Sequence, residues 1–255
     1  MARIIAVTNQ KGGVGKTTTC VNLAASLAAM KRRVLLIDLD PQGNATTGSG
    51  LVKNELEFSV FDVLVGSHGV KEVMKKSDPS GYWVLPANGD LTGAEVALLD
   101  LPSKETRLRS GLYEVDNEFD FILLDCPPSL NMLTVNALSA SQGVLIPVQC
   151  EYYALEGLTA LLQTIERITH ALNPSLQIDG IVRTMYDPRP SLTHDVSSQL
   201  QKHFGDKVYD TVIPRNIRLA EAPSYGLPVL HYEKQSRGAI AYLALAGEFI
   251  RKQKT

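Results

Sequence analysis

The stretch Gln10-Lys11-Gly12-Gly13-Val14-Gly15-Lys16-Thr17-Thr18-Thr19 stands close to the start of this 255-residue sequence. The apolar run 3–9 before it is short enough for a buried strand, and the run 20–30 after it is rich in helix formers. A strand, a glycine-rich loop, a Lys-Thr pair and a helix form the context of a phosphate-binding P-loop. The backbone N–H groups of such a loop and the positive end of the helix dipole attract an anion. The alternative is a glycine-rich turn without a ligand.

Two lysines in this loop are expected to have different roles. Lys16 is expected to reach the outer phosphates of a nucleotide, while the Thr17 hydroxyl binds Mg²⁺. In the standard pattern G-x-x-x-x-G-K-[ST], the first glycine would stand at position 10, but the sequence has Gln10 followed by Lys11. A lysine at this place need not serve its own nucleotide, because it is able to reach one held by another subunit.

Three aspartates follow apolar runs of strand length, namely Asp38, Asp40 and Asp125. Sheets of α/β proteins carry their chemistry at the carboxyl ends of parallel strands, beside the first strand-to-helix loop. We expect Asp40 to orient a water that attacks the γ-phosphate, and Asp38 to support the loop or the surroundings of the metal. Asp125 resembles a Walker B aspartate, which holds Mg²⁺ through a water opposite Thr17. The alternative for Asp38 and Asp40 is that they cap the turn that follows.

Strand-like runs alternate with helical segments along the chain, which predicts an α/β fold with a doubly wound, mostly parallel sheet flanked by helices. No repeat, low-complexity tract or linker divides the sequence, so we expect a single domain, 1–255. The stretch 46–50 is expected to be a loop, and a helix is expected to begin near Ser129. Further strands are predicted at 33–40, 82–86, 119–125, 143–149, 176–185 and 208–213, and helices at 58–64, 108–115, 154–171, about 191–204 and about 236–251.

Composition indicates an ordinary globular protein, with 44% hydrophobic and 20% charged residues. No apolar run approaches the roughly 18 residues of a membrane span, and we expect no signal peptide. The three cysteines, Cys20, Cys126 and Cys150, lack metal-ligand spacing and are expected to be small buried residues in a reducing cytoplasm. From Arg183 onward 11 basic residues stand against 7 acidic ones, which is compatible with a polyanionic partner.

The last predicted helix has Ile240, Leu243 and Ile250 on an apolar face. We expect this face to dock on the domain, and a helix lying on a membrane surface is the alternative. The spacing of the loop arginines beyond residue 186 leaves two interpretations open: solvated side chains or contacts to DNA.

Five motifs in order resemble those of the ParA/Soj family of chromosome-partitioning ATPases, over essentially the whole chain. They are the deviant Walker A motif at 11–18 and the segments at 38–44, 125–129, 149–157 and 213–216. The resemblance implies a deviant Walker A P-loop NTPase fold and Mg²⁺-dependent hydrolysis of ATP. Because the sequence starts on its first strand, it resembles the short type, without an N-terminal helix-turn-helix extension.

The resemblance further implies a switch cycle. ATP drives formation of a sandwich homodimer, in which Lys11 of each subunit contacts the nucleotide of the other. That dimer binds double-stranded DNA without sequence preference, and a ParB-type partner stimulates hydrolysis and releases the DNA. The expected location is cytoplasmic and nucleoid-associated, and no membrane partner is expected.

The resemblance assigns roles to residues by motif. Lys11, Lys16 and Asp40 are the implied catalytic residues, and Pro214 and Asn216 are implied to lie by the adenine. The family often has a small or polar residue where Pro190 stands, and the proline stiffens the turn at Arg189. Implied phosphate and Mg²⁺ contacts are Lys11, Gly12, Gly13, Val14, Gly15, Lys16, Thr17 and Thr18, with Asp125 through a water; implied DNA contacts are Arg189, Arg215 and Arg218.

Two other classes of protein share the loop. A MinD-like, membrane-cycling ATPase would need bulky apolar residues in a C-terminal amphipathic helix, whereas the tail after Ile250 is polar and basic. A relative of nitrogenase reductase would bridge an iron–sulfur cluster across the dimer with two cysteines per subunit. The three cysteines of this sequence do not match that pattern.

Overall fold

All eight strands of the protein lie in one sheet, in the order β3-β4-β2-β5-β1-β6-β7-β8. The computed structural model describes residues 1–253. Neighbouring strands run parallel except for β3 and β4, which confirms the predicted doubly wound, mostly parallel architecture. The strands are β1 (Arg3–Val7), β2 (Val34–Asp38), β3 (Lys75–Lys76), β4 (Trp83–Leu85), β5 (Phe121–Asp125), β6 (Gly143–Gln149), β7 (Gln177–Tyr186) and β8 (Val208–Pro214).

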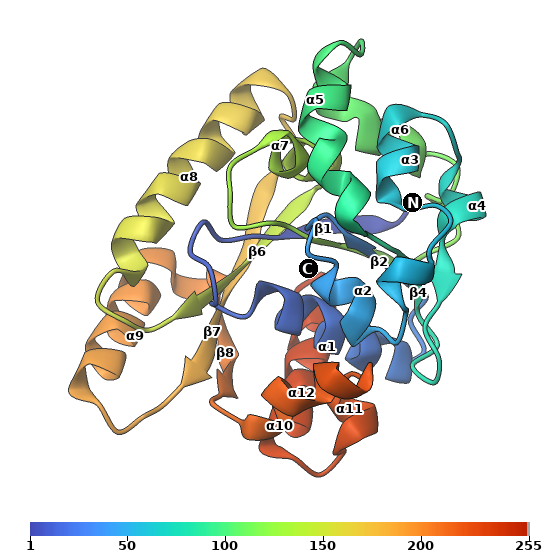
Figure 1. Ribbon diagram of the computed structural model, residues 1–255. Helices are drawn as coiled ribbons and strands as arrows, with labels where there is room; N and C mark the ends of the chain where they lie inside the picture. Colours follow the sequence, from blue (N-terminus) through green and yellow to red (C-terminus); the bar gives the residue numbers. More distant parts are fainter. Residues whose placement is uncertain (254–255) are drawn as a thin grey trace.

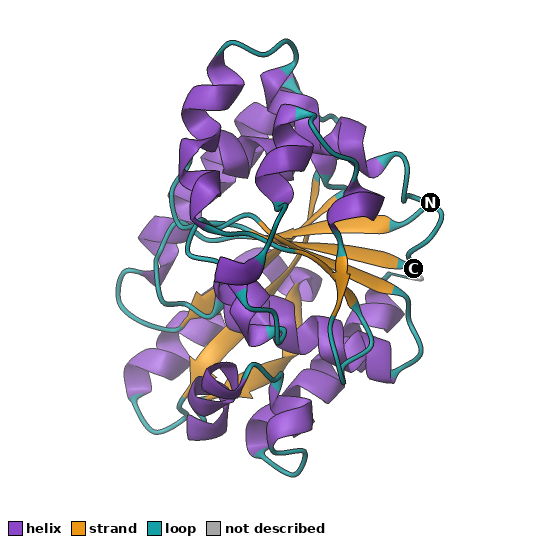
Figure 2. Cartoon of the chain, turned by 45° about the vertical axis from the view of Figure 1, so that its right-hand side comes forward, coloured by secondary structure: helices purple, strands orange, loops and turns teal. Residues whose placement is uncertain are grey.

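Helices cover both faces of this sheet (Figures 1 and 2). The group α3 to α7 lies above the sheet in the view of Figure 1, and α1 lies below it with α10, α11 and α12. The helices are α1 (Lys16–Ala29), α2 (Asn44–Gly48), α3 (Val60–Val65), α4 (Val70–Val73), α5 (Ala94–Leu99), α6 (Arg107–Leu112), α7 (Met132–Ala140), α8 (Ala154–Ala171), α9 (Ser191–Phe204), α10 (Ile217–Glu221), α11 (Val229–Tyr232) and α12 (Arg237–Lys252).

The central strands β1, β2 and β5 are mostly apolar, as expected for strands with both faces buried. Side chains alternate along a strand, so Ile4 and Ala6 of β1 enter the core on one face while Ile5 and Val7 enter the core on the other. Strands β2 and β5 repeat this pattern, which fixes the register of β5 against β1 and of β2 against β5.

The position of β1 decides where a ligand is able to bind. The chain leaves β1 toward β2 on one side, and the later strands β6, β7 and β8 lie on the other side. Such a reversal opens a crevice at the carboxyl ends of the strands. The loop 8–15 follows β1 at this point.

Two predicted element boundaries are wrong. Residues 44–48 form the short helix α2 rather than a loop, because the backbone N–H and the hydroxyl of Thr46 both donate to the buried carboxylate of Asp38 at 2.8 Å. Helix α7 begins at Met132 rather than near Ser129, because the side chain of Asn131 caps it by accepting from the N–H of Thr134 at 3.1 Å.

Helix α12 docks on the domain, and Ile250 of the predicted face packs against the core, but other residues form the buried centre of this contact. Tyr242, Leu245 and Phe249 are buried, and the Phe249 ring packs edge-on against Phe121 with 5.2 Å between ring centroids. Ile240, which we expected at the interface, is 58% exposed. The polar end of the tail, Lys254 and Thr255, lies outside the described residues. Within residues 1–253 no helix is both long enough and apolar enough to cross a bilayer.

Replacement of Phe249 by alanine is expected to destabilise the fold by about 3–5 kcal/mol, because it opens a cavity between α12 and the sheet. Urea denaturation measures this loss, and Ile240→Ala on the same helix is the matched control with a change near zero. Equal losses for the two variants would contradict this packing of α12.

Candidate active site

The loop between β1 and α1 has the geometry of an anion cradle. Gly13 and Gly15 have φ angles of 73° and 86°, in the left-handed region that favours glycine. A Cβ atom added at Gly12 or Gly13 would meet nothing within 4 Å. Helix α1 starts at Lys16 with no side-chain cap from the described residues and no acidic residue in its first turn. Its first N–H groups therefore face open space, where an anion is the natural partner.

Polar side chains from distant parts of the chain hold this loop in place. The Asn9 amide donates to the carbonyl of Pro147 at 2.8 Å and accepts from the N–H of Lys11 at 3.0 Å. The Thr184 hydroxyl donates to the carbonyl of Val14 at 2.8 Å. Sequence reasoning missed both braces, since Pro147 and Thr184 lie on β6 and β7, far from the loop in sequence.

A cavity of about 610 Å³ opens above the loop and brings together most of the predicted nucleotide residues. Lys11 does not line it, and Val14 is buried beneath the loop. Sequence reasoning missed Asn44, Thr184, Met185 and Tyr242 in the lining. Of the predicted residues, the lining contains Gly12, Gly13, Gly15, Lys16, Thr17, Thr18, Asp40, Pro214 and Asn216, together with Arg215.

Lys16 is held inside the site. Its side chain is largely buried, and its Nζ donates to the carbonyl of Lys11 at 3.1 Å. Burial lowers the pKa of Lys16, although the charges of Asp125 and Asp40 act in the opposite direction. The ammonium group is thus partly desolvated and lies near two acids. A phosphate that binds to it has to displace little water.

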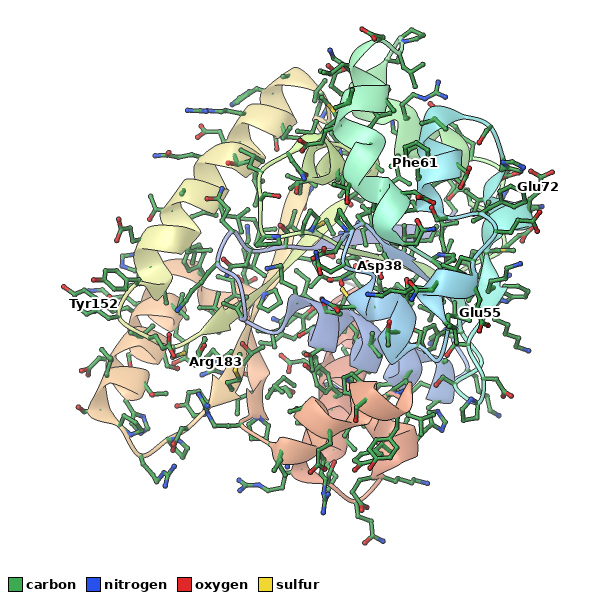
Figure 3. All side chains as sticks on the ribbon, in the orientation of Figure 1. Asp38, Glu55, Phe61, Glu72, Tyr152 and Arg183 are labelled. Carbon is green, nitrogen blue, oxygen red and sulfur yellow. The ribbon has the colours of Figure 1, made fainter. Side chains whose placement is uncertain are left out.

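Two fully buried carboxylates stand side by side beneath the cavity. Asp38 and Asp125 are paired in register on β2 and β5, and Figure 3 shows Asp38 at the centre of the molecule. Burial raises the pKa of Asp38 to about 6, and burial together with the charge of Asp38 raises the pKa of Asp125 well above its usual range. A cation bound between two such carboxylates would stabilise their charged forms.

Asp125 also has an unused oxygen. Its Oδ1 accepts a weak hydrogen bond from the Cys20 thiol at 3.5 Å, while its buried Oδ2 has no hydrogen-bond partner among the described residues. A buried oxygen without a partner is costly unless water or an ion satisfies it. The Thr17 hydroxyl lies at the start of α1 on the same cavity. These oxygen donors therefore fit a hydrated Mg²⁺.

Asp38 and Asp40 have different environments although only one residue separates them. Asp38 is fully buried and accepts two hydrogen bonds from Thr46. It therefore supports the segment after β2, which is the first of the two roles expected for it. Asp40 is partly exposed and lines the cavity, and its Oδ1 accepts from the N–H of Gln42 at 2.9 Å. A carboxylate with an open side facing the cavity is able to accept a proton or orient a water.

Lys11 points away from the cavity. Its Nζ forms an ion pair with Glu151 at 2.7 Å, and both side chains are partly exposed. Glu151 belongs to the segment between β6 and α8, whose neighbouring Tyr152 projects outward at the edge of the molecule (Figure 3). Lys11 is therefore at the surface and does not contact its own phosphate loop through its ammonium group.

The three predicted DNA-contacting arginines differ in their surroundings. Arg189 pairs with Asp187 at 2.6 Å, and Arg218 pairs with Glu221 at 2.7 Å. The Arg189 guanidinium lowers the pKa of Asp187 to about 2. Arg215 lines the nucleotide-sized cavity and forms no ion pair with the residues that the structure describes.

The three cysteines are buried free thiols, as the sequence predicted. Burial raises the pKa of Cys20, Cys126 and Cys150. Across residues 1–253 no group of three or more His, Cys, Asp or Glu side chains is arranged to ligate a metal by itself.

Comparison with known proteins decides the family. A family model described as "AAA domain" matches residues 2–178. The sporulation initiation inhibitor protein Soj of Bacillus subtilis is 53% identical to this chain, over 97% of it and 98% of Soj. The chain belongs to the ParA/Soj family of chromosome-partitioning ATPases.

Two further similarities agree with this family assignment. The chromosome partitioning protein ParA of Caulobacter vibrioides is 50% identical, over 99% of this chain and 95% of that protein. A solved structure titled cobyrinic acid a,c-diamide synthase from Mycobacterium smegmatis, with a bound ATP analogue and magnesium, superposes with a TM-score of 0.88. It is 38% identical and covers 100% of this chain and 97% of that one. The ParA/Soj family thus accounts for the whole described fold, including β8 and α12 beyond the matched AAA segment.

Replacement of Asp125 by asparagine is expected to stabilise the ligand-free protein while abolishing its stabilisation by Mg²⁺-ATP. The folded-state pKa of Asp125 is raised above its unfolded value, so ionisation of Asp125 opposes folding increasingly as the pH rises from the unfolded pKa toward the folded one. The gain in melting temperature should therefore be larger at pH 8 than at pH 5. Thermal unfolding with and without Mg²⁺-ATP measures both effects.

The exposed Asp100 provides the control, because Asp100→Asn should leave the melting temperature and the ligand effect unchanged. Destabilisation of the ligand-free protein by Asp125→Asn at pH 8 would show that the buried pair carries no repulsion.

Proposed function

We propose that this ParA/Soj-family chain is a DNA-segregation ATPase, whose ATP-bound homodimer binds double-stranded DNA without sequence preference. The supporting observation is the single cavity that joins the phosphate loop and Asp40 to Pro214 and Asn216. Its volume of about 610 Å³ suits a molecule the size of ATP, with the triphosphate at one end and the base at the other. Residues 1–255 act as one domain in this proposal.

Bound ATP with Mg²⁺ supplies the phosphoanhydride bond and a divalent charge next to the outer phosphates. The N–H groups from Gly13 to Thr18 donate to the phosphate oxygens, and the Lys16 ammonium compensates their charge. The Thr17 hydroxyl and, through a water, the unpartnered oxygen of Asp125 hold the metal. The buried acids then face a cation instead of each other, which removes the repulsion of the ligand-free protein.

Asp40 orients the attacking water. Its carboxylate lines the cavity and is only partly satisfied by the N–H of Gln42, so it has an oxygen available for a water. The backbone N–H of Asp40 donates to Asp38 at 3.2 Å, which fixes the position of the residue relative to the buried pair. A water held here loses its freedom before the reaction, and this lowers the barrier.

Lys11 acts in trans. The ion pair with Glu151 keeps its ammonium group outside its own cavity and at the surface. When two subunits meet face to face, Lys11 exchanges Glu151 for the phosphates held by the partner subunit, which carry more negative charge. Charge-assisted contacts of this kind are strong, so dimer formation depends on the triphosphate.

DNA binding uses Arg189, Arg215 and Arg218, which follow the neighbouring strands β7 and β8. Two of these arginines exchange an exposed carboxylate for a backbone phosphate, and exposed ion pairs are weak enough to allow this exchange. A ParB-type partner stimulates hydrolysis and so releases the DNA. A chain with this cycle works in the cytoplasm and associates with the nucleoid.

Lys11→Ala is expected to bind ATP within about threefold of the parent but to form no ATP-dependent dimer, since its ammonium group makes no contact in its own cavity. The comparison is made in an Asp40→Ala background, which is expected to keep ATP unhydrolysed and the dimer intact. Size exclusion with ATP, ADP or no nucleotide measures the dimer, and a fluorescent ATP analogue measures binding. Lys76→Ala, on the exposed edge strand β3, is the control. A normal dimer of the Lys11 variant would refute the trans role.

Arg218→Glu is expected to weaken ATP-dependent DNA binding by at least about tenfold, because it replaces a phosphate contact with a like charge. The affinity of the parent should fall steeply with salt, since each phosphate contact releases counterions. Filter binding at two salt concentrations measures both. Lys75→Glu, at the opposite edge of the sheet, makes the same charge change as a control. Affinity that does not respond to salt would exclude phosphate contacts.

A further inference from the structure

Thr184 is the last part of β7 to touch the phosphate loop. Its side chain is buried, and its hydroxyl donates to the carbonyl of Val14 at 2.8 Å. Its Cβ and methyl group would lie 3.9 Å from a Cβ placed on Gly15. Thr184 therefore contacts the loop at the peptide that joins Val14 to Gly15, and it also lines the nucleotide cavity beside the loop.

The contact orients one particular donor. The carbonyl of Val14 and the N–H of Gly15 belong to the same planar trans peptide, so they point in opposite directions. With the carbonyl fixed toward Thr184, the N–H of Gly15 points away from Thr184, and Gly15 itself lines the cavity. Glycine at 15 has a wide choice of backbone angles, since its φ of 86° lies where other residues rarely go. An outside partner is therefore needed to select one orientation of this peptide.

The residue after Thr184 separates two cavities. Met185 has a φ of 48°, in the left-handed region, which is strained for a side chain of this kind. It lines the nucleotide cavity and also a second cavity of about 350 Å³. Arg215 lines both cavities as well, and Arg189 lines the second one. Met185 and Arg215 thus separate the nucleotide cavity from the second cavity, which Arg189 lines.

Hydrogen bonds and a ring contact hold the residues on either side of Thr184 and Met185 in place. The buried Arg183 guanidinium donates to Ser197 and to the carbonyl of Tyr209, both at 2.8 Å, and lies 5.8 Å from the centre of the Tyr186 ring. Figure 3 shows Arg183 beside the ends of β7 and β8. The carbonyl of Tyr186 accepts from the N–H of Arg215 at 3.4 Å. These contacts connect the strand end that carries Thr184 to the backbone of Arg215.

We propose that Thr184 is a positioning residue that directs the N–H of Gly15 toward the bound phosphate and, through Met185, couples an occupied phosphate loop to the position of Arg215 and Arg189. The second part rests on the proposed DNA binding, while the first part depends only on nucleotide binding. Coupling between two sites is reciprocal, so DNA on the arginines also strengthens the hold of Thr184 on the loop.

The test compares Thr184→Val, which keeps the shape but loses the hydroxyl, with Thr184→Ser, which keeps the hydroxyl. The valine variant is expected to bind ATP roughly fivefold more weakly, about the size of one neutral hydrogen bond. At saturating nucleotide its preference for DNA in the ATP form over the ADP form is expected to fall to about twofold, from a parent value of roughly 5- to 150-fold typical of coupled sites. The serine variant should restore both quantities.

Thr169→Val is the matched control, because the Thr169 hydroxyl also donates to a carbonyl, that of Ile165 at 2.9 Å, but on α8 away from the loop. Thr184→Ala, which leaves space instead of a methyl group against the carbonyl, gives the same comparison should the valine variant not fold. A variant that only loses melting temperature, with ATP affinity and DNA preference unchanged, overturns the proposal. So does a serine variant that behaves like valine.

The two proposals fail in different ways. A parent protein that binds ATP but shows no DNA binding refutes the proposed function, whereas the ATP affinity of Thr184→Val still tests the role at Gly15. A parent that prefers DNA in the ATP form, with a valine variant that retains the full preference, refutes the coupling alone.

Discussion

The uncapped N-terminus of α1 is the constraint on which the rest of this structure depends. The first N–H groups of a helix have no partner inside the helix and need one from outside. No capping side chain from the described residues and no first-turn acid supplies it here. The glycines of the loop and the partly desolvated Lys16 direct more positive charge at the same point. The surrounding sheet supports this site from β6 and β7, through Asn9 and Thr184.

The buried carboxylates supply the negative charge beneath the same cavity. Asp38 and Asp125 stand opposite each other on β2 and β5, and each raises the energy of the other in the ligand-free protein. An uncharged residue at Asp125 would remove this repulsion, but it would also remove an oxygen that is able to hold a metal. Functional sites commonly break a rule of stability in this way. Here the compensation is a bound cation, which makes nucleotide binding and folding stability interdependent.

Three surface cations near the site each pair with a carboxylate of the same chain. Lys11 contacts Glu151, Arg189 contacts Asp187, and Arg218 contacts Glu221. Exposed pairs of this kind contribute roughly 0–1 kcal/mol each, so a phosphate-rich partner is able to replace the carboxylates. In the described structure Lys11, Arg189 and Arg218 thus each have a carboxylate partner, and the dimer and DNA contacts that we propose would replace these partners.

The sequence by itself determined the parallel sheet, the loop glycines, Lys16 and the aspartates at the strand ends, because these follow from short-range patterns: apolar runs, left-handed turns and the start of a helix. It also matched α8 to the residue. Only the tertiary structure decided which residues of α12 form the centre of its packed face, because Phe249 packs against Phe121, which lies on β5 far away in sequence. The same holds for Thr184, which braces Val14 from 170 residues away. Spacing along the chain carries no information about a hydrogen bond between two strand ends, which exists only once β1 and β7 share a sheet.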